Sequence, residues 1–270
     1  MVKIKETALG EGIPKICVPV MGANQEEVLE NAQELQHDLI DMVEWRVDYW
    51  ENLQDTEKII ETASLLQSMF TKKPLLFTFR TAKEGGEKEI SWEDYRKLLE
   101  TMAASHSVDL IDVEAFRGYD AVSEEKKQWQ ADDACNAGVQ ALIQILQKDV
   151  AVIGSYHDFF KTPSQEEIAN RLAFISEIGA DIPKIAVMPK KESDVFTLMQ
   201  ATLQAKEAIG DKPVITMSMA SMGSISRILG ASFGSAVTFG CVGVPSAPGQ
   251  IEASKLSTLL QQMEDMRQGR

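Results

Sequence analysis

The chain has 270 residues, of which 44% are hydrophobic and 25% are charged, a composition typical of a globular protein with a sizeable core. Its formal net charge of −14 argues against a nucleic-acid partner, because phosphates attract basic surfaces. A small anionic substrate remains compatible, provided that a few arginines are focused in one cleft. No apolar run approaches the roughly 20 residues of a membrane span, and the N-terminal segment lacks the apolar core of a signal peptide. We therefore expect a cytoplasmic protein without a membrane partner.

The cysteines are few and far apart. Cys17, Cys135 and Cys241 are odd in number and form no CxxC motif, so neither a disulfide framework nor a zinc site is expected. Cys17 and Cys241 lie in apolar runs, which favours buried packing.

Short β-branched runs alternate with longer amphipathic patterns along the chain. The runs predict strands at 15–20, 42–48, 74–80, 108–114, 150–157, 184–189, 213–218 and 236–242. Helical patterns start near Gln25, Glu57, Ser91, Ser164 and Glu192, and a last one covers 249–266. The Ser91 and Ser164 patterns begin with S-x-x-D/E capping signals, and glycines 179 and 210 follow two of the helices.

Eight strand–helix units imply a wholly parallel sheet, because each parallel connection needs a crossover. Both an open doubly wound sheet and a closed barrel fit this alternation, but no G-x-G-x-x-G follows the first strand. We predict the α/β class and one (β/α)₈ TIM barrel over residues 1–270, near the typical length of that fold. Residues 1–14 are expected to cover the bottom of the barrel. The segment 119–149 is long for one crossover and predicts an inserted turn or an extended helix.

Active sites of such barrels lie at the C-terminal ends of the strands, so polar residues within the strands are informative. Glu44, Arg46 and Asp48 recur at a spacing of two and point to one face, predicted to be the lumen. The alternative is a purely structural ion pair between Glu44 and Arg46. Arg80 lies at the tip of the third strand. On composition alone, Glu84 in the following loop is a solvated charge.

Two further strands carry candidate catalytic groups. His157 ends the fifth strand, whereas His37 and His106 fall near helix ends and are expected at the surface. Lys184 shares a strand face with small Ala186. A lysine buried in the lumen near arginines would have a lowered pKa and become a neutral nucleophile; the alternative is a surface lysine at a strand start.

The loops after strands seven and eight often hold anionic groups in barrels. Arg227 follows a Ser/Gly-rich loop, and Ser246 and Gln250 lie in a loop constrained by Pro and Gly. A guanidinium matches a carboxylate bidentately, so these three residues predict a site for a substrate carboxylate.

Several of these runs together resemble the type I 3-dehydroquinate dehydratase family. The runs match in order and spacing over nearly the whole chain: EWRVD (44–48), FRTAKEGG (79–86), SYHDFFKTP (155–163), PKIAVMP (183–189), ITMSM (215–219), ISR (225–227), TFG (238–240) and SAPGQ (246–250). The resemblance implies dehydration of 3-dehydroquinate to 3-dehydroshikimate, in the route to chorismate and aromatic amino acids, without a metal or cofactor, in a homodimer.

The resemblance also implies residue roles. Lys184 corresponds to the lysine that forms a Schiff base, His157 to the general acid and base, and Glu84 to the carboxylate that orients the histidine. The remaining candidates correspond to substrate-binding residues: Glu44, Arg46, Arg80, Arg227, Ser246 and Gln250.

Two features depart from the family pattern, and two other functions remain open. Pro19 stands where family members often have a serine, and the segment 119–136 exceeds the usual length. Another Schiff-base barrel enzyme, such as a class I aldolase, shares the buried lysine but does not require the arginine set. A non-catalytic barrel that binds a shikimate-like acid keeps the arginines and predicts binding without turnover.

Overall fold

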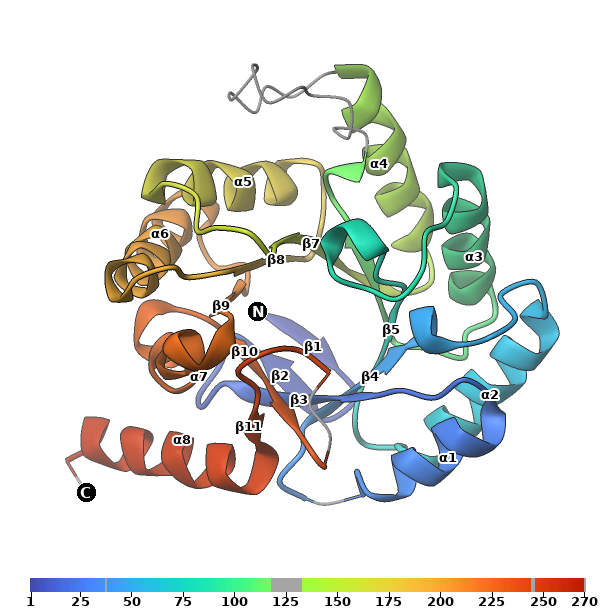
Figure 1. The fold of residues 1–270 in the computed structure, drawn as a ribbon, viewed down its shortest axis with the longest axis horizontal. Coiled ribbons are helices and arrows are strands. Elements are labelled where there is room, and N and C mark those ends of the chain that lie inside the picture. The colour runs from blue at the N-terminus through green and yellow to red at the C-terminus, as the bar shows by residue number, and fades with distance from the viewer. Residues whose placement is uncertain (37, 118–132, 244–245, 270) are drawn as a thin grey trace.

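A computed structural model describes residues 1–36, 38–117, 133–243 and 246–269. A ring of parallel strands lies at its centre and a layer of helices surrounds it (Figure 1). The central strands are β3 (Lys15–Val20), β4 (Met42–Arg46), β5 (Leu75–Thr78), β6 (Leu110–Glu114), β7 (Ala151–Asp158), β8 (Ile182–Val187), β9 (Ile215–Ser218) and β10 (Val237–Cys241). The outer helices are α1 (Gln25–Gln33), α2 (Thr56–Met69), α3 (Trp92–Ala104), α4 (Asp133–Leu146), α5 (Gln165–Glu177), α6 (Glu192–Ile209), α7 (Ala220–Phe233) and α8 (Ala253–Arg267).

The strand order closes the sheet on itself. Neighbouring strands from β3 to β9 follow chain order, and β10 pairs with β3 on the other side. A parallel bridge between Val214 and Ser235 joins the starts of β9 and β10, where the Ala236 amide donates to the Val214 carbonyl at 2.8 Å. The predicted single (β/α)₈ barrel fold is confirmed.

The local signals for helix ends are also confirmed. Ser91 Oγ accepts a hydrogen bond from the Asp94 amide at 3.1 Å, and Ser164 Oγ accepts one from the Glu167 amide at 3.2 Å. Such caps satisfy donors that have no partner within the helix. Gly210 ends α6 with a positive φ of 75°, a conformation that glycine adopts without a Cβ clash.

The strands separate two apolar layers. One lies between the sheet and the helices and includes Trp45, Phe77 and Leu172. The other fills the lumen and includes Met42, Ile215 and further side chains near the strand starts. The C-terminal half of the lumen also carries buried charged side chains, among them Glu44, Arg80 and Lys184, which leaves that end of the barrel for chemistry.

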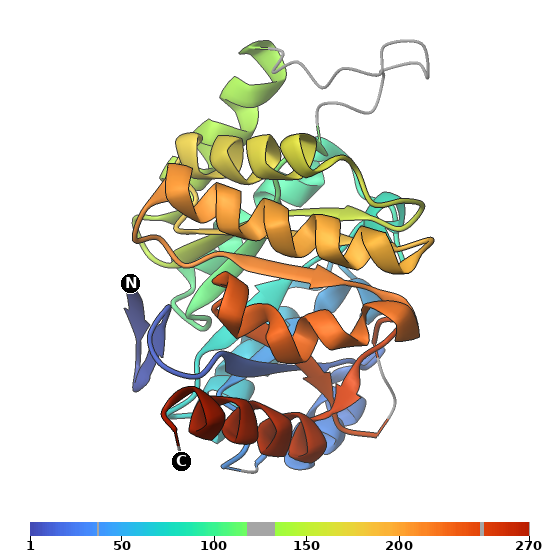
Figure 2. The ribbon, with the colours of Figure 1, turned by 90° about the vertical axis from the view of Figure 1, so that its left-hand side faces the viewer.

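Three short strands were not predicted from the sequence. β1 (Val2–Ile4) and β2 (Thr7–Leu9) form an antiparallel hairpin, whose three-residue strands are too short for a periodic signal. Figure 2 shows this hairpin at the end of the barrel where the strands begin, and Leu9 belongs to the lumen cluster. β11 (Ile251–Glu252) pairs with the tip of β10 and was also not predicted. Most of the long segment 119–136 lies outside the described residues.

Candidate active site

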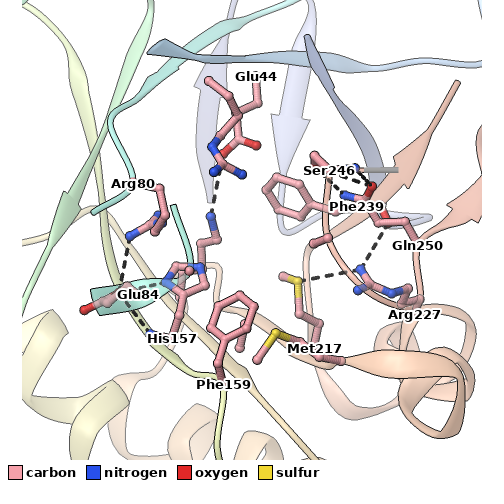
Figure 3. A pocket seen from close by; sticks show the side chains of 16 residues that line it. Glu44, Arg80, Glu84, His157, Phe159, Met217, Arg227, Phe239, Ser246 and Gln250 are labelled. Atoms are coloured by element: carbon pink, nitrogen blue, oxygen red, sulfur yellow. Dashed lines mark hydrogen bonds and ion pairs between the residues drawn. The ribbon is translucent and has the colours of Figure 1, made fainter. Parts of the chain in front are cut away.

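All nine predicted site residues line one pocket at the C-terminal ends of the strands (Figure 3). They come from β4, the β5–α3 loop, β7, β8, α7 and the β10–α8 loop. The other lining residues are Gly85, Phe159, Ala186, Met217, Met219, Phe239 and Ala247. The pocket therefore combines a charged side with an apolar side of aromatic and methionine side chains.

Lys184 lies in the middle of β8 and points into the lumen. Its side chain is only 4% exposed, and Nζ donates to Asp112 Oδ2 at 3.1 Å. The same ammonium is 3.9 Å from Glu44 Oε1 and 4.6 Å from the ring centroid of Phe239. The alternative of a surface lysine at a strand start is therefore wrong. A buried primary amine faces the pocket, as an imine-forming group requires.

His157 and Glu84 form a hydrogen-bonded pair across the pocket wall. Nδ1 of His157 lies 2.9 Å from Oε2 of Glu84, and the His157 amide donates to the same oxygen at 3.1 Å. Burial lowers the pKa of His157 well below its usual value, and the charges of Arg80, Lys184 and Arg46 add to this. The network thus assigns a neutral ring with Nδ1–H donated to Glu84, which leaves the Nε2 lone pair free as a base.

The pKa of Glu84 depends on a neighbouring cation and on other neighbouring acids. Burial raises its pKa well above the usual value, and the negative charge of Glu114 adds to the effect, while Arg80 opposes it. The distance to His157 suits an ion pair, but both pKa shifts disfavour one. The contact is therefore a hydrogen bond to a neutral imidazole and not a salt bridge.

Arg80 is enclosed by carboxylates. Its guanidinium donates to Asp112 at 2.7 Å, Glu114 at 3.1 Å and Glu84 at 3.3 Å. Burial alone lowers the pKa of Arg80, but these three acids outweigh it and the net pKa is raised. Sequence reasoning missed Asp112 and Glu114. The signal that was available is their spacing of two in a buried strand.

Arg46 pairs with Asp48, not with Glu44. The guanidinium binds both carboxylate oxygens of Asp48 at 2.8 and 2.7 Å. This pairing arises because β4 ends at Arg46, and Asp48 lies in a short 3₁₀ turn, Val47–Tyr49, that curls back over the strand. Glu44 instead accepts from the Thr78 hydroxyl at 2.9 Å. The expected alternative of a Glu44–Arg46 ion pair is wrong.

Arg227 is buried without an acidic partner among the described residues. Its Nη1 donates to the Phe239 carbonyl at 3.1 Å and its Nη2 to the Pro248 carbonyl at 3.4 Å, while Nε has no partner there. Burial lowers the pKa of Arg227 to about 10. Beside it, Gln250 Oε1 accepts from the Ser246 amide at 2.8 Å. A buried guanidinium held only by neutral groups suits a bound anion.

Two negative findings accompany this geometry. Across the described ranges, no group of three or more His, Cys, Asp or Glu side chains is placed to hold a metal ion. Within the same part of the chain, no helix has the length and apolarity needed to cross a membrane.

Known proteins match nearly the whole chain. The family model for type I 3-dehydroquinase matches residues 16–267. A 3-dehydroquinate dehydratase from Clostridium botulinum (strain Eklund 17B / Type B) is 45% identical over 266 residues, which is 98% of each chain. One from Clostridioides difficile (strain 630) is 44% identical over 96% of this chain and 95% of its own.

Solved structures agree with this assignment. The crystal structure of the type I 3-dehydroquinate dehydratase from Clostridium difficile superposes with a TM-score of 0.88 at 42% identity, covering 98% of both chains. That from Geobacillus kaustophilus HTA426 gives 0.86 at 33% identity, covering 97% of this chain and 96% of its own. The chain therefore belongs to the type I 3-dehydroquinase family.

Proposed function

We propose that the chain dehydrates 3-dehydroquinate, its reaction in the shikimate pathway, through a covalent imine between Lys184 and the substrate ketone. The reaction follows from family membership. The observation that carries the imine is the amine of Lys184, buried in the pocket together with the His157–Glu84 pair. The solved relative from Clostridium difficile, described as containing covalent modified comenic acid, is consistent with covalent chemistry in the family.

The proposed reaction passes through a carbinolamine and a protonated imine. Lys184 gives up one ammonium proton, and its amine adds to the C3 carbonyl carbon. The hydroxyl of the resulting carbinolamine takes up a proton and leaves as water, which gives a protonated imine. The cationic nitrogen acidifies the C2 proton, which Nε2 of His157 removes. The C1–O bond then breaks, and the leaving hydroxyl takes that proton from His157 to become the second water. Addition of one water to the product imine restores Lys184 and the ketone, so the net change is the loss of one water.

The other pocket residues are assigned to substrate binding. Arg227, with Ser246 and Gln250 beside it, provides the partner for the substrate carboxylate, because its charge is buried and has only neutral protein partners. Glu44, Arg46 and Arg80 face the ring hydroxyls from the opposite, charged side of the pocket. Glu84 fixes the tautomer of His157, as orienting carboxylates do in catalytic triads.

The test combines product formation with covalent trapping. We expect 3-dehydroquinate to yield an absorbing conjugated enone, and borohydride added during turnover to leave one reduced adduct, located on Lys184 by peptide mass mapping. Turnover with no adduct, or with an adduct on another residue, would contradict the imine mechanism. An aldolase would instead release two smaller carbonyl compounds, and a non-catalytic binding protein would give no product.

We further propose that the protein works in the cytoplasm as a homodimer and that residues 1–14 cover the bottom of a single catalytic barrel domain. The position of Leu9 in the lumen cluster supports the role of the N-terminal segment. Light scattering on the eluted protein is expected to give twice the chain mass of 29.9 kDa; a mass equal to one chain at working concentration would contradict the dimer.

A further inference from the structure

Asp112 makes a contact with Lys184 that none of the assigned roles explains. It lies on β6 and reaches across the lumen to Lys184 on β8, past the intervening strand β7. Its carboxylate is completely buried. Burial of an unpaired carboxylate costs free energy. The groups that bind Asp112 therefore indicate its role.

The two oxygens of Asp112 have different partners. Oδ1 accepts from Arg80 Nη2 at 2.7 Å and from the Ser155 hydroxyl at 2.6 Å. These two bonds fix the plane of the carboxylate. Within the described part of the chain, Oδ2 accepts only from Lys184 Nζ, at 3.1 Å. One oxygen is therefore an anchor, and the other is directed at the nitrogen on which the proposed imine forms.

We propose that Asp112 is the counter-ion of the Lys184 imine: it positions Nζ and keeps the imine nitrogen protonated while the C2 proton is removed. This inference rests on the proposed imine mechanism. When the carbinolamine loses water, the nitrogen becomes a cation that retains one N–H, and that N–H points to Oδ2 in place of an ammonium hydrogen. The positive charge is then stabilised at the atom that must withdraw electrons from C2.

The surrounding charges favour Asp112 over other acids for this role. Glu44 is the other carboxylate that an ion-pair distance links to Nζ, but it is 3.9 Å away and its Oε1 already accepts from Thr78. Burial raises the pKa of Asp112, but Arg80 and Lys184 outweigh burial and bring it down to about 2. Asp112 thus stays ionised at every pH at which the enzyme would work.

A pH experiment must consider every ionisable group near Nζ. Those that face or electrostatically influence Lys184 are Cys17 on β3, Glu44 on β4, Asp112 on β6 and His157 on β7, with Arg80 behind Asp112. Among the described residues, only Asp112 accepts a hydrogen bond from Nζ. Its removal is therefore expected to lower the pKa of the imine more than removal of any other acid in the group.

The test measures how the trapped fraction depends on pH. Borohydride reduces the protonated imine, so the alkaline limit of trapping reports loss of the imine proton. In Asp112→Asn we expect an adduct still to form on Lys184, the alkaline limit to move down by about 1 pH unit or more, and kcat to fall more than KM changes. The control is Glu114→Gln, which removes another buried carboxylate of the same strand that binds Arg80 but does not touch Lys184. Its alkaline limit is expected to match that of the wild type.

The outcomes separate the two proposals. No adduct in the wild-type protein would overturn the imine itself. If the wild type forms the adduct and Asp112→Asn has the same alkaline limit of trapping as the wild type, the counter-ion role is overturned and the imine mechanism stands. If Asp112→Asn does not fold, Asp112→Ala purified in formate provides the second measurement. Formate carries the carboxylate that Asp112→Ala lacks. Removal of formate from the folded variant is expected to move the alkaline limit of trapping down, and an unchanged limit would overturn the counter-ion role.

Discussion

Glu84 and His157 are 73 positions apart in the chain, yet one carboxylate oxygen of Glu84 receives both the backbone amide and the ring Nδ1 of His157. This double contact fixes the position and the orientation of the ring together. It also couples the β5–α3 loop, which carries Glu84, to the end of β7. The catalytic pair is thus completed by a residue of the loop that follows β5, not by a residue of the strand itself.

Replacement of Lys184 by alanine is expected to abolish both borohydride trapping and turnover, since no other amine is buried in the pocket among the described residues. The loss in kcat is expected on the order of 10⁴-fold or more, as for other nucleophile deletions. Lys190→Ala, at an exposed position just beyond the same strand, serves as the control and should trap normally. Full activity of Lys184→Ala would exclude covalent catalysis by this residue.

Replacement of His157 by glutamine is expected to separate imine formation from proton transfer. The variant should still give an adduct on Lys184, whereas kcat should fall about 10²- to 10⁴-fold, the usual contribution of a general base. Rapid-quench trapping followed by mass measurement would show the accumulated adduct. His106→Gln, in which an exposed ring is changed, is the matched control. Normal turnover of His157→Gln would remove this residue from the mechanism.

The acid limb of kcat/KM is expected below pH 6.5, because the pKa of His157 is lowered by burial and by nearby cations. The base form of the ring then persists as the pH falls below the usual value. Glu84→Gln removes the ionisable group that contacts the ring and adds no negative charge there, so imidazolium gains no stabilisation. The limb should therefore not rise, while kcat falls. Glu89→Gln, in an exposed position of the same segment, should leave the limb unchanged. A limb that rises in Glu84→Gln would contradict the assigned contact.

Loss of the Arg227 guanidinium is expected to weaken substrate binding more than chemistry. Arg227→Gln should raise KM about 10- to 100-fold, the value of a charge-assisted hydrogen bond. Shikimate, which has a carboxylate but no ketone, should raise the melting temperature of the wild type by binding linkage and that of the variant much less. Arg96→Gln, at a half-exposed helix position, is the control. An equal shift in both proteins would place the carboxylate elsewhere.

The N-terminal hairpin is expected to contribute stability without affecting the site. Leu9→Ala deletes a fully buried side chain of the lumen cluster and should lower the free energy of unfolding by about 2–5 kcal/mol. Urea denaturation measures this change, and KM at a temperature where the variant is folded should be unaltered. Leu39→Ala, at a position 46% exposed, should change stability by less than about 0.5 kcal/mol. A loss of activity without a loss of stability would contradict the proposed role.

The sequence, together with its family motifs, was enough to predict the barrel and nine of the residues that line the pocket, although composition alone had placed Glu84 in solvent. Alternation of apolar strands with amphipathic helices specifies parallel strands, and side-chain alternation within a strand specifies which residues face the lumen. Since the C-terminal ends of parallel strands meet at one end of a barrel, residues as distant as Glu44 and Gln250 were expected together. The family motifs added the roles.

Only the tertiary structure decided which charges pair. Alternation gives the face of Arg46, but the 3₁₀ turn after β4 gives it Asp48 as partner. Alternation likewise gives Asp112 a lumen position. Its contact with Lys184, however, depends on barrel curvature and on the Ser155 hydroxyl, which holds the other carboxylate oxygen. Partners across a lumen are fixed by distances of a few ångströms in three dimensions, and periodicity along one strand carries no information on those distances.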